Sequence, residues 1–248
     1  MSRKKISVVL ATFNEEKNIK ACLDSVKDWA DEMIIIDEFS TDDTVNIAKK
    51  IGAKVFQEPH EPIFHVTKNK AINQAKYEWI LQLDADERIT PEMKKEILGI
   101  LDGEYFGYDN WISPLKATIN KIIKIYPEPK PLTEAASAYW LPRKNFFLGR
   151  YLTHTGQYPD PVIRLFQKGK AILPAKSVHE QMKVDGPIGW LKSDLDHYAT
   201  PDFSRYLLRE NRYSSLEATD LKKQGVKISF FNTLNYLFFM PAGTFFRL

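Results

Sequence analysis

Two acidic residues, Asp84 and Asp86, follow directly after the apolar segment 79–83. That segment is typical of a buried strand, which places both carboxylates on the turn at its end. Two carboxylates spaced in this way can reach one hard cation. Mg²⁺ and Mn²⁺ are often held by one or two carboxylates together with the phosphate oxygens of a substrate. The pattern therefore fits binding of a nucleoside diphosphate, although a solvated acidic turn before a helix gives the same sequence.

A third carboxylate, Asp37, ends the Ile-rich segment 33–37. A carboxylate buried there is costly unless it has a hydrogen-bond partner. A ribose or a base edge would supply one, and capping of the turn 37–40 is the structural alternative. Neither G-x-G-x-x-G nor G-x-x-x-x-G-K-[ST] occurs, which argues against dinucleotide and P-loop sites.

The elements that would position these acids alternate between strand and helix. Strands are expected at 6–10, 33–37, 54–57 and 79–83. Helix signals separate and follow them: a capping box from Thr12 to Glu15, a helix closed by Gly52, a helix over 65–76, and a helix opened by Thr90-Pro91. This alternation predicts an α/β fold with a mostly parallel sheet covered by helices on both faces. Ligands of such sheets bind at the carboxyl ends of the strands, where Thr12, Asp37 and Asp84 would meet.

The pattern changes after residue 103. The proline-bearing segment 104–137 is expected to be an excursion over the site, and short antiparallel strands are expected at 138–142, 162–167 and 171–173. A long helix runs from Pro201 to Gly225. We expect an α/β half at 1–103, a second half of the same domain at 104–200, and a C-terminal helix and tail at 201–248.

Composition excludes several classes of protein. Apolar residues make up 44% of the chain and charged residues 27%, as in a globular protein with a core. The net charge is +3, and the lysines are spread among acidic residues and form no basic stripe. No nucleic-acid partner is therefore expected. Cys22 is the only cysteine and falls on the buried side of a helical pattern, which excludes an intrachain disulfide and favours a core role. With no signal-peptide pattern at residues 1–10, we expect a cytoplasmic location.

The tail 226–248 is apolar and aromatic. Its charged side chains are Lys227 and Arg247, and it contains seven Phe and Tyr residues. Polar and helix-breaking residues interrupt the apolar run, which argues against a bilayer-spanning helix. Peripheral contact with the inner face of the cell membrane is one interpretation. Packing against the protein's own core or a second subunit is the other, and the oligomeric state is not readable.

Several motifs in order resemble family 2 glycosyltransferases of the GT-A fold. They are S-V-V-L-A-T-F-N-E at 7–15, I-I-D-E-F-S-T-D-D-T at 35–44 and L-D-A-D-E at 83–87. The later half is similar to the lipopolysaccharide-core glucosyltransferase-like branch, through 141–150, 158–160, 164–166, 178–180 and 197–198. The sequence departs from the family pattern beside the predicted nucleotide pocket. Where the family usually has Gly-Ser or Asn-Ser, this chain has Glu38-Phe39.

The resemblance implies an inverting sugar transfer from a nucleotide-sugar, with UDP-hexose the expected donor, to a glycan or lipid-linked acceptor in cell-envelope or lipopolysaccharide-core synthesis. It implies a nucleotide-sugar pocket built from Thr12, Glu15, Asp37, Lys68, Asn69, Asp84 and Arg164. Asp86 and His197 would hold a divalent Mg²⁺ or Mn²⁺. Glu180 would be the catalytic base, with Asp160 in reserve. A nucleotidyltransferase and a catalytically silent nucleotide-binding scaffold are the alternatives.

Overall fold

The computed structural model describes residues 2–112, 117, 128–153, 158–174, 181–200, 202–223, 225 and 229–247. The chain forms two compact units. Unit 1 comprises Met1–Lys144 and Pro159–His197, and unit 2 comprises Asn145–Tyr158 and Tyr198–Leu248. The three-part division at residues 103 and 200 stays a prediction. Residues 113–116 and 118–127 of the proline-bearing segment 104–137 lie outside the described residues.

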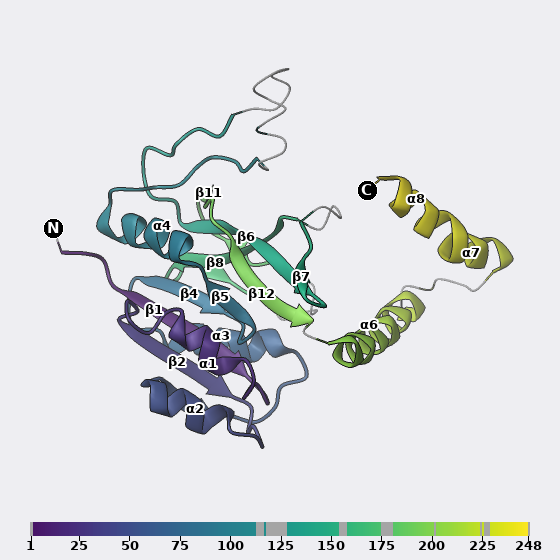
Figure 1. Ribbon diagram of the computed structural model, residues 1–248, viewed down its shortest axis with the longest axis horizontal. Helices are drawn as coiled ribbons and strands as arrows, with labels where there is room; N and C mark the ends of the chain where they lie inside the picture. The colour runs from purple at the N-terminus through teal and green to yellow at the C-terminus, as the bar shows by residue number, and fades with distance from the viewer. Residues whose placement is uncertain are drawn as a thin grey trace. The chain divides into compact units, whose positions relative to one another are not determined.

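Four parallel strands form one side of the sheet of unit 1, in the order β3-β2-β1-β4 (Figure 1). They are β1 (Ile6–Thr12), β2 (Glu32–Asp37), β3 (Lys54–Gln57) and β4 (Trp79–Leu83). Helices α1 (Ile19–Asp24), α2 (Thr44–Ile51) and α3 (Phe64–Gln74) connect them. Thr12 pairs with Asp37 and Leu10 with Leu83, so the carboxyl ends of these strands share one edge. The predicted parallel sheet is confirmed.

The sheet continues beyond β4 with antiparallel strands. β8 (Asp160–Gln167) pairs with β4, and β6 (Ala138–Phe147) pairs with β8. The order then runs through β12 (Leu195–Thr200) to β5 (Glu87–Ile89), which are antiparallel to each other. Short strands complete the described sheets: β7 (Arg150–Tyr151) and β11 (Ile188–Trp190) on β6, and the separate pair β9 (Ala171–Ile172) and β10 (Lys183–Val184). The expected antiparallel portion is therefore present.

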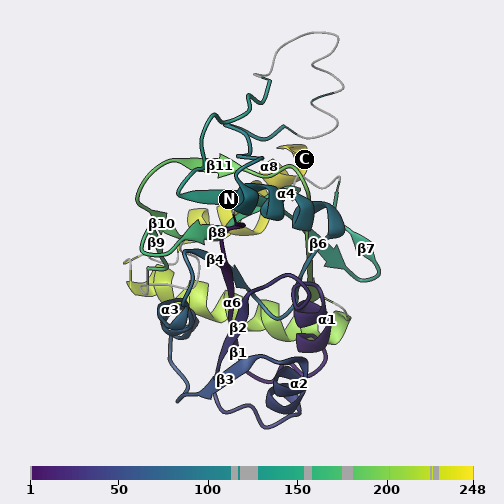
Figure 2. The same ribbon diagram turned by 90° about the vertical axis from the view of Figure 1, so that its left-hand side faces the viewer.

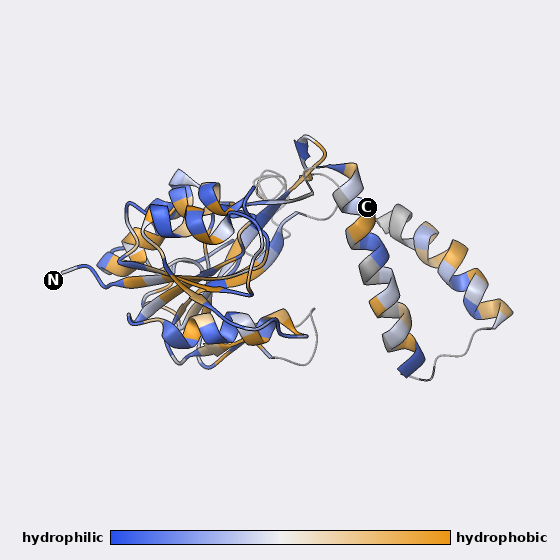
Figure 3. Ribbon diagram, turned by 90° about the horizontal axis from the view of Figure 1, so that it is seen from below, coloured by the Kyte–Doolittle hydropathy of each residue, from blue (hydrophilic) through white to orange (hydrophobic). Residues whose placement is uncertain are grey.

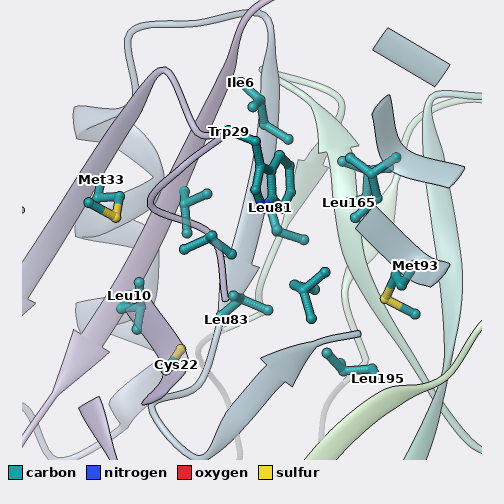
Figure 4. Close-up of a cluster of buried hydrophobic side chains, with 14 of the residues drawn as sticks. Ile6, Leu10, Cys22, Trp29, Met33, Leu81, Leu83, Met93, Leu165 and Leu195 are labelled. Atoms are coloured by element: carbon teal, nitrogen blue, oxygen red, sulfur yellow. The ribbon is translucent and has the colours of Figure 1, made fainter. Parts of the chain in front are cut away.

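Helices cover both faces of the parallel strands because successive side chains of a strand point to opposite sides. Val8 and Leu10 pack with α1 and α4 (Pro91–Asp102), and Val9 packs with α3 on the other face (Figure 2). Figure 4 shows the first of these cores, in which the Cys22 side chain lies among other buried apolar groups. The core role expected of Cys22 is confirmed.

The observed ends of the helices can be compared with the capping residues predicted from the sequence. Thr90 caps α4, since its Oγ1 accepts a hydrogen bond from Met93 N at 3.2 Å, and Gly52 closes α2 with a φ of +100°. The expected capping box from Thr12 to Glu15 is wrong. Thr12 is the last residue of β1, and α1 begins at Ile19 after Asn18, which makes no side-chain cap. Thr12 instead hydrogen-bonds across the sheet edge, as described below.

Unit 2 consists mainly of helices. α6 (Phe203–Lys223) is followed by α7 (Phe230–Leu234), a π-helical turn η1 (Asn235–Phe239) and α8 (Met240–Arg247). Figure 3 colours the apolar residues along these helices. The large side chains from 230 to 240 are largely exposed, with Phe231 at 81% and Phe239 at 69%. Within the part of the chain that the structure describes, no helix combines the length and apolar character needed to cross a membrane.

Candidate functional site

The carboxyl edge of β1 and β2 is organised around Asp37. Its fully buried carboxylate accepts hydrogen bonds from Thr12 Oγ1 at 2.9 Å and from Ser40 N at 2.8 Å, and Ser40 Oγ donates a third. A carboxylate offers about four acceptor positions, so the protein itself fills most of them. These bonds match the turn-capping alternative for Asp37 and account for how a carboxylate is tolerated at the end of an Ile-rich strand.

The loops after β1 and β2 are bonded to each other. Asn14 N donates to Ser40 Oγ at 2.8 Å, and Thr41 N donates to Asn14 Oδ1 at 2.8 Å. Glu15 N donates to Thr44 Oγ1 at 2.7 Å, while the Glu15 carboxylate accepts from Asn18 Nδ2 at 2.7 Å. Glu15 therefore lies at the edge where Thr12 and Asp37 meet, and the two loops form one rim joined by these hydrogen bonds.

A buried cluster of charges lies at the end of β4. Arg164 is 6% exposed and donates to Gln82 Oε1, Asp84 Oδ2 and Glu87 Oε1, at 2.5, 2.5 and 2.7 Å. The Nζ of Lys68 lies 2.5 Å from the other Asp84 oxygen. Most donors of the Arg164 guanidinium are thus committed to protein acceptors. The structure makes Arg164 a residue that positions Asp84.

These pairs control the protonation of the cluster. Burial by itself would raise the pKa of Asp84, but the Arg164 and Lys68 charges outweigh it and hold that pKa well below its usual range. Burial would likewise lower the pKa of Arg164, and the Asp84 and Glu87 carboxylates raise it instead. Asp84 is therefore a fixed anion and Arg164 a fixed cation at neutral pH. Burial, with the nearby carboxylates, raises the pKa of the Cys22 thiol, which keeps it unreactive.

Two site residues were not singled out from the sequence. Glu87 has no exposed side-chain surface and accepts from Arg164, from Arg143 Nη1 at 3.4 Å and from Asp84 N at 3.0 Å. Arg143 also pairs with Asp160. Glu87 belongs to the D-A-D-E motif itself, so its place was visible in the sequence, but its role as the buried counter-charge depends on the partners that folding brings to it.

Asp86 and His197 come together through the pairing of β12 with β5, in which His197 lies opposite Glu87. His197 Nε2 lies 3.5 Å from Asp86 Oδ2. Burial would raise the pKa of Asp86, but the hydrogen bond and charge of His197, together with the Arg143 charge, outweigh burial and lower that pKa. A carboxylate and an imidazole are a donor set that a divalent cation accepts. Among the described residues no group of three or more His, Cys, Asp or Glu gathers to hold a metal.

The remaining predicted residues differ in their placement. Asn69 does not present its amide to the cluster, because Nδ2 donates to Leu173 O at 2.7 Å and Oδ1 accepts from Leu173 N at 3.2 Å. His65 Nδ1 lies 3.0 Å from Pro174 O. Both side chains of α3 thus anchor the chain just before residues 175–180. Glu180 lies outside the described residues.

The acids lie along the carboxyl edge of a parallel sheet, and the antiparallel strands joined to that sheet bring His197 beside Asp86. This combination of fold and site is that of a GT-A glycosyltransferase. The model of glycosyl transferase family 2 matches residues 7–169, and the chain belongs to this family. Membership of this family argues for a glycosyltransferase and against the nucleotidyltransferase alternative.

Relatives agree with this assignment. An uncharacterized glycosyltransferase of Rickettsia typhi is 32% identical over 250 residues, covering 98% of this chain and 77% of the relative. The glycosyltransferase SunS of Bacillus subtilis is 38% identical over 112 residues, 44% of this chain and 26% of SunS.

Among solved structures, S. aureus TarS 1-349 in complex with UDP has a TM-score of 0.48 at 19% identity, covering 79% of this chain and 61% of that fragment. Glucosyl-3-phosphoglycerate synthase from Mycobacterium tuberculosis, in complex with Mn²⁺ and UDP, has a TM-score of 0.36 at 27% identity over 44% of each chain. This chain thus spans about three quarters of the Rickettsia relative and less than two thirds of the TarS fragment.

Proposed function

We propose that this glycosyltransferase moves a hexose from a UDP-sugar donor to a glycan or lipid-linked acceptor, with inversion, in cell-envelope or lipopolysaccharide-core synthesis. The observation that carries the proposal is the approach of Asp86 to His197 beside the Asp84 cluster. A diphosphate needs a cation between itself and an acidic site, and this pair offers two protein ligands while leaving the remaining positions to phosphate oxygens.

Asp86 and His197 would hold a divalent Mg²⁺ or Mn²⁺, which supplies charge neutralisation for the leaving diphosphate. The Asp84 carboxylate, kept ionised and oriented by Lys68 and Arg164, would accept hydrogen bonds from hydroxyls of the donor sugar or ribose. Thr12, Glu15 and Asp37 would form the nucleotide side of the pocket, with the hydrogen-bonded loop pair behind them. Lys68 would act on the donor by orienting Asp84. Asn69 would act on it by holding Leu173 through two hydrogen bonds.

Glu180 is our proposal for the base that takes the proton of the acceptor hydroxyl. A carboxylate on the face opposite the leaving group is what inversion requires. Asp160 is paired with Arg143, which makes it the weaker candidate.

The tail is proposed to contact the inner face of the cell membrane. Phe230, Phe231, Phe238 and Phe239 are each more than 60% exposed. No acidic side chain occurs at 226–248, whereas Lys227 and Arg247 carry positive charge. Apolar helices with only cationic charge suit an anionic lipid surface. Such contact would bring the enzyme to a lipid-linked acceptor.

The test is calorimetric titration with UDP, in the presence and absence of Mn²⁺, of the wild type, Asp86→Ala and the control Asp43→Ala. Asp43 is an exposed acid at the same edge, outside the cluster. We expect Asp86→Ala to lose the Mn²⁺-dependent part of UDP binding while its thermal unfolding stays unchanged, and Asp43→Ala to bind as the wild type does. Equal Mn²⁺-dependent affinity in Asp86→Ala and wild type would remove the metal role of Asp86.

A further inference from the structure

A second buried carboxylate, Glu38, follows Asp37 directly and takes no part in the Asp84 cluster. Its side chain has no exposed surface. It accepts hydrogen bonds from Thr67 Oγ1 and His60 Nδ1, and Glu61 N lies 3.5 Å from its Oε1. A buried acid is costly unless it is paired, so its presence beside the site needs an explanation.

The bond between Glu38 and His60 is unusual because the side chain of His60 is mostly exposed. The side chain of His60 is 64% accessible although its Nδ1 is bound to a fully buried carboxylate. With Nδ1 donating to the Glu38 carboxylate, the neutral ring carries its proton on that nitrogen. Nε2 has no hydrogen-bond partner among the described residues. Glu38 therefore fixes the ring and its tautomer while the second nitrogen is left accessible.

His60 lies at the same edge as the predicted nucleotide pocket. Glu58 N donates to Asp37 O at 2.9 Å, so the chain that leaves β3 passes the end of β2 two residues before His60. The ring of Phe13, the residue after Thr12, lies 5.7 Å from the His60 ring at an interplanar angle of 42°. Phe13 is itself 44% exposed. An aromatic face and an oriented ring nitrogen thus stand together at the rim.

The backbone at this rim is strained. Phe39 has a φ of +54°, in the left-handed region that a bulky side chain rarely adopts. The bonds of Ser40 to Asp37 hold the turn in this conformation. Strain of this kind persists where the surrounding structure fixes it, and it is concentrated at functional sites. A histidine that only neutralised Glu38 would require neither the exposed ring nor the aromatic neighbour.

We propose that His60 is a specificity-determining residue for the base of the donor nucleotide, and that Glu38 is the positioning residue that acts through it. The inference rests on the proposed nucleotide-sugar donor. In the neutral ring Nε2 is a hydrogen-bond acceptor, which matches a base edge with an imino N–H, such as uracil. Cytosine has an acceptor at that ring position and makes a poorer match. Phe13 offers its face to the ring of the same base.

The experiment measures the affinities of UDP, CDP and inorganic pyrophosphate, each with Mn²⁺, for the wild type, His60→Phe and His60→Gln. His60→Phe keeps a ring beside Phe13 and removes Nε2, whereas His60→Gln keeps an acceptor oxygen. We expect His60→Phe to weaken UDP about tenfold, the equivalent of one hydrogen bond, and to abolish the preference for UDP over CDP. Pyrophosphate affinity should not change, and His60→Gln should restore part of the preference.

Glu38 is tested through its coupling to His60. Glu38→Gln should reduce the UDP preference by itself, and in the His60→Phe background it should have no further effect. An unchanged preference in His60→Phe, or an equal loss of pyrophosphate affinity, would overturn the inference and leave the proposed function standing. If the wild-type protein binds no nucleoside diphosphate in the presence of Mn²⁺, both the inference about His60 and the proposed function are refuted.

Discussion

Replacing Arg164 by Met should destabilise the protein more than any single surface charge change. Arg164 is buried and supplies hydrogen bonds to Gln82, Asp84 and Glu87. Met preserves much of the apolar volume but leaves two carboxylates without their main counter-charge. Asp84 keeps Lys68, whereas the cation left near the fully buried Glu87, within the described part of unit 1, is Arg143 at 3.4 Å.

The size of the effect follows from this arrangement. Removing one partner of a buried, hydrogen-bonded ion pair costs about 3–5 kcal/mol, because the other charge stays buried and uncompensated. For a chain of this length each kcal/mol shifts Tm by about 2–4 °C, so Arg164→Met should lower Tm by roughly 6–20 °C. The double variant Arg164→Met/Glu87→Gln should recover about 1–3 kcal/mol, since the neutral amide removes the unpaired charge.

Thermal and urea unfolding, followed by circular dichroism, measure both variants. Lys20→Met is the matched control, because Lys20 and Asp24 form a pair of similar length on the exposed surface of α1. We expect no measurable change for this control. A Tm for Arg164→Met within about 2 °C of the wild type would contradict the burial argument, as would a double variant less stable than the single one.

Two further predictions concern turnover and membrane binding. Glu180→Gln should lower kcat by about 10²–10⁴-fold and leave the UDP dissociation constant unchanged, and Asp160→Asn should keep most of the activity. Nucleoside-diphosphate release and calorimetry measure these effects, and full turnover by Glu180→Gln would place the base elsewhere. In flotation with phosphatidylglycerol vesicles, the wild-type chain should float with the vesicles. The variant Phe238→Ser/Phe239→Ser should remain in the protein fraction at the bottom of the gradient. Equal flotation of the two proteins would refute a membrane role for these residues.

Much of unit 1 follows from short-range signals in the sequence. The expected strand at 54–57 and the strand at 79–83 have the observed bounds, and the Thr90 cap and Gly52 closure are present. These features depend on residues a few positions apart, so side-chain periodicity and capping chemistry are sufficient to reveal them. The same local reasoning was wrong at Thr12, where strand pairing with β2 and the bond to Asp37 replaced a helix cap.

The alternating strands and helices, and the positions of Asp37 and Asp84 at strand ends, could be predicted from the sequence because they depend on local pattern and on the direction of parallel strands. The groups that contact those acids became visible in the folded structure alone. Arg164 reaches Gln82, 82 positions away in the chain, through the antiparallel pairing of β8 with β4, and His197 reaches Asp86 through β12 and β5. No local pattern reveals the register of strands so far apart, yet that register sets the charge and hydrogen bonding of Asp84, Asp86 and Glu87.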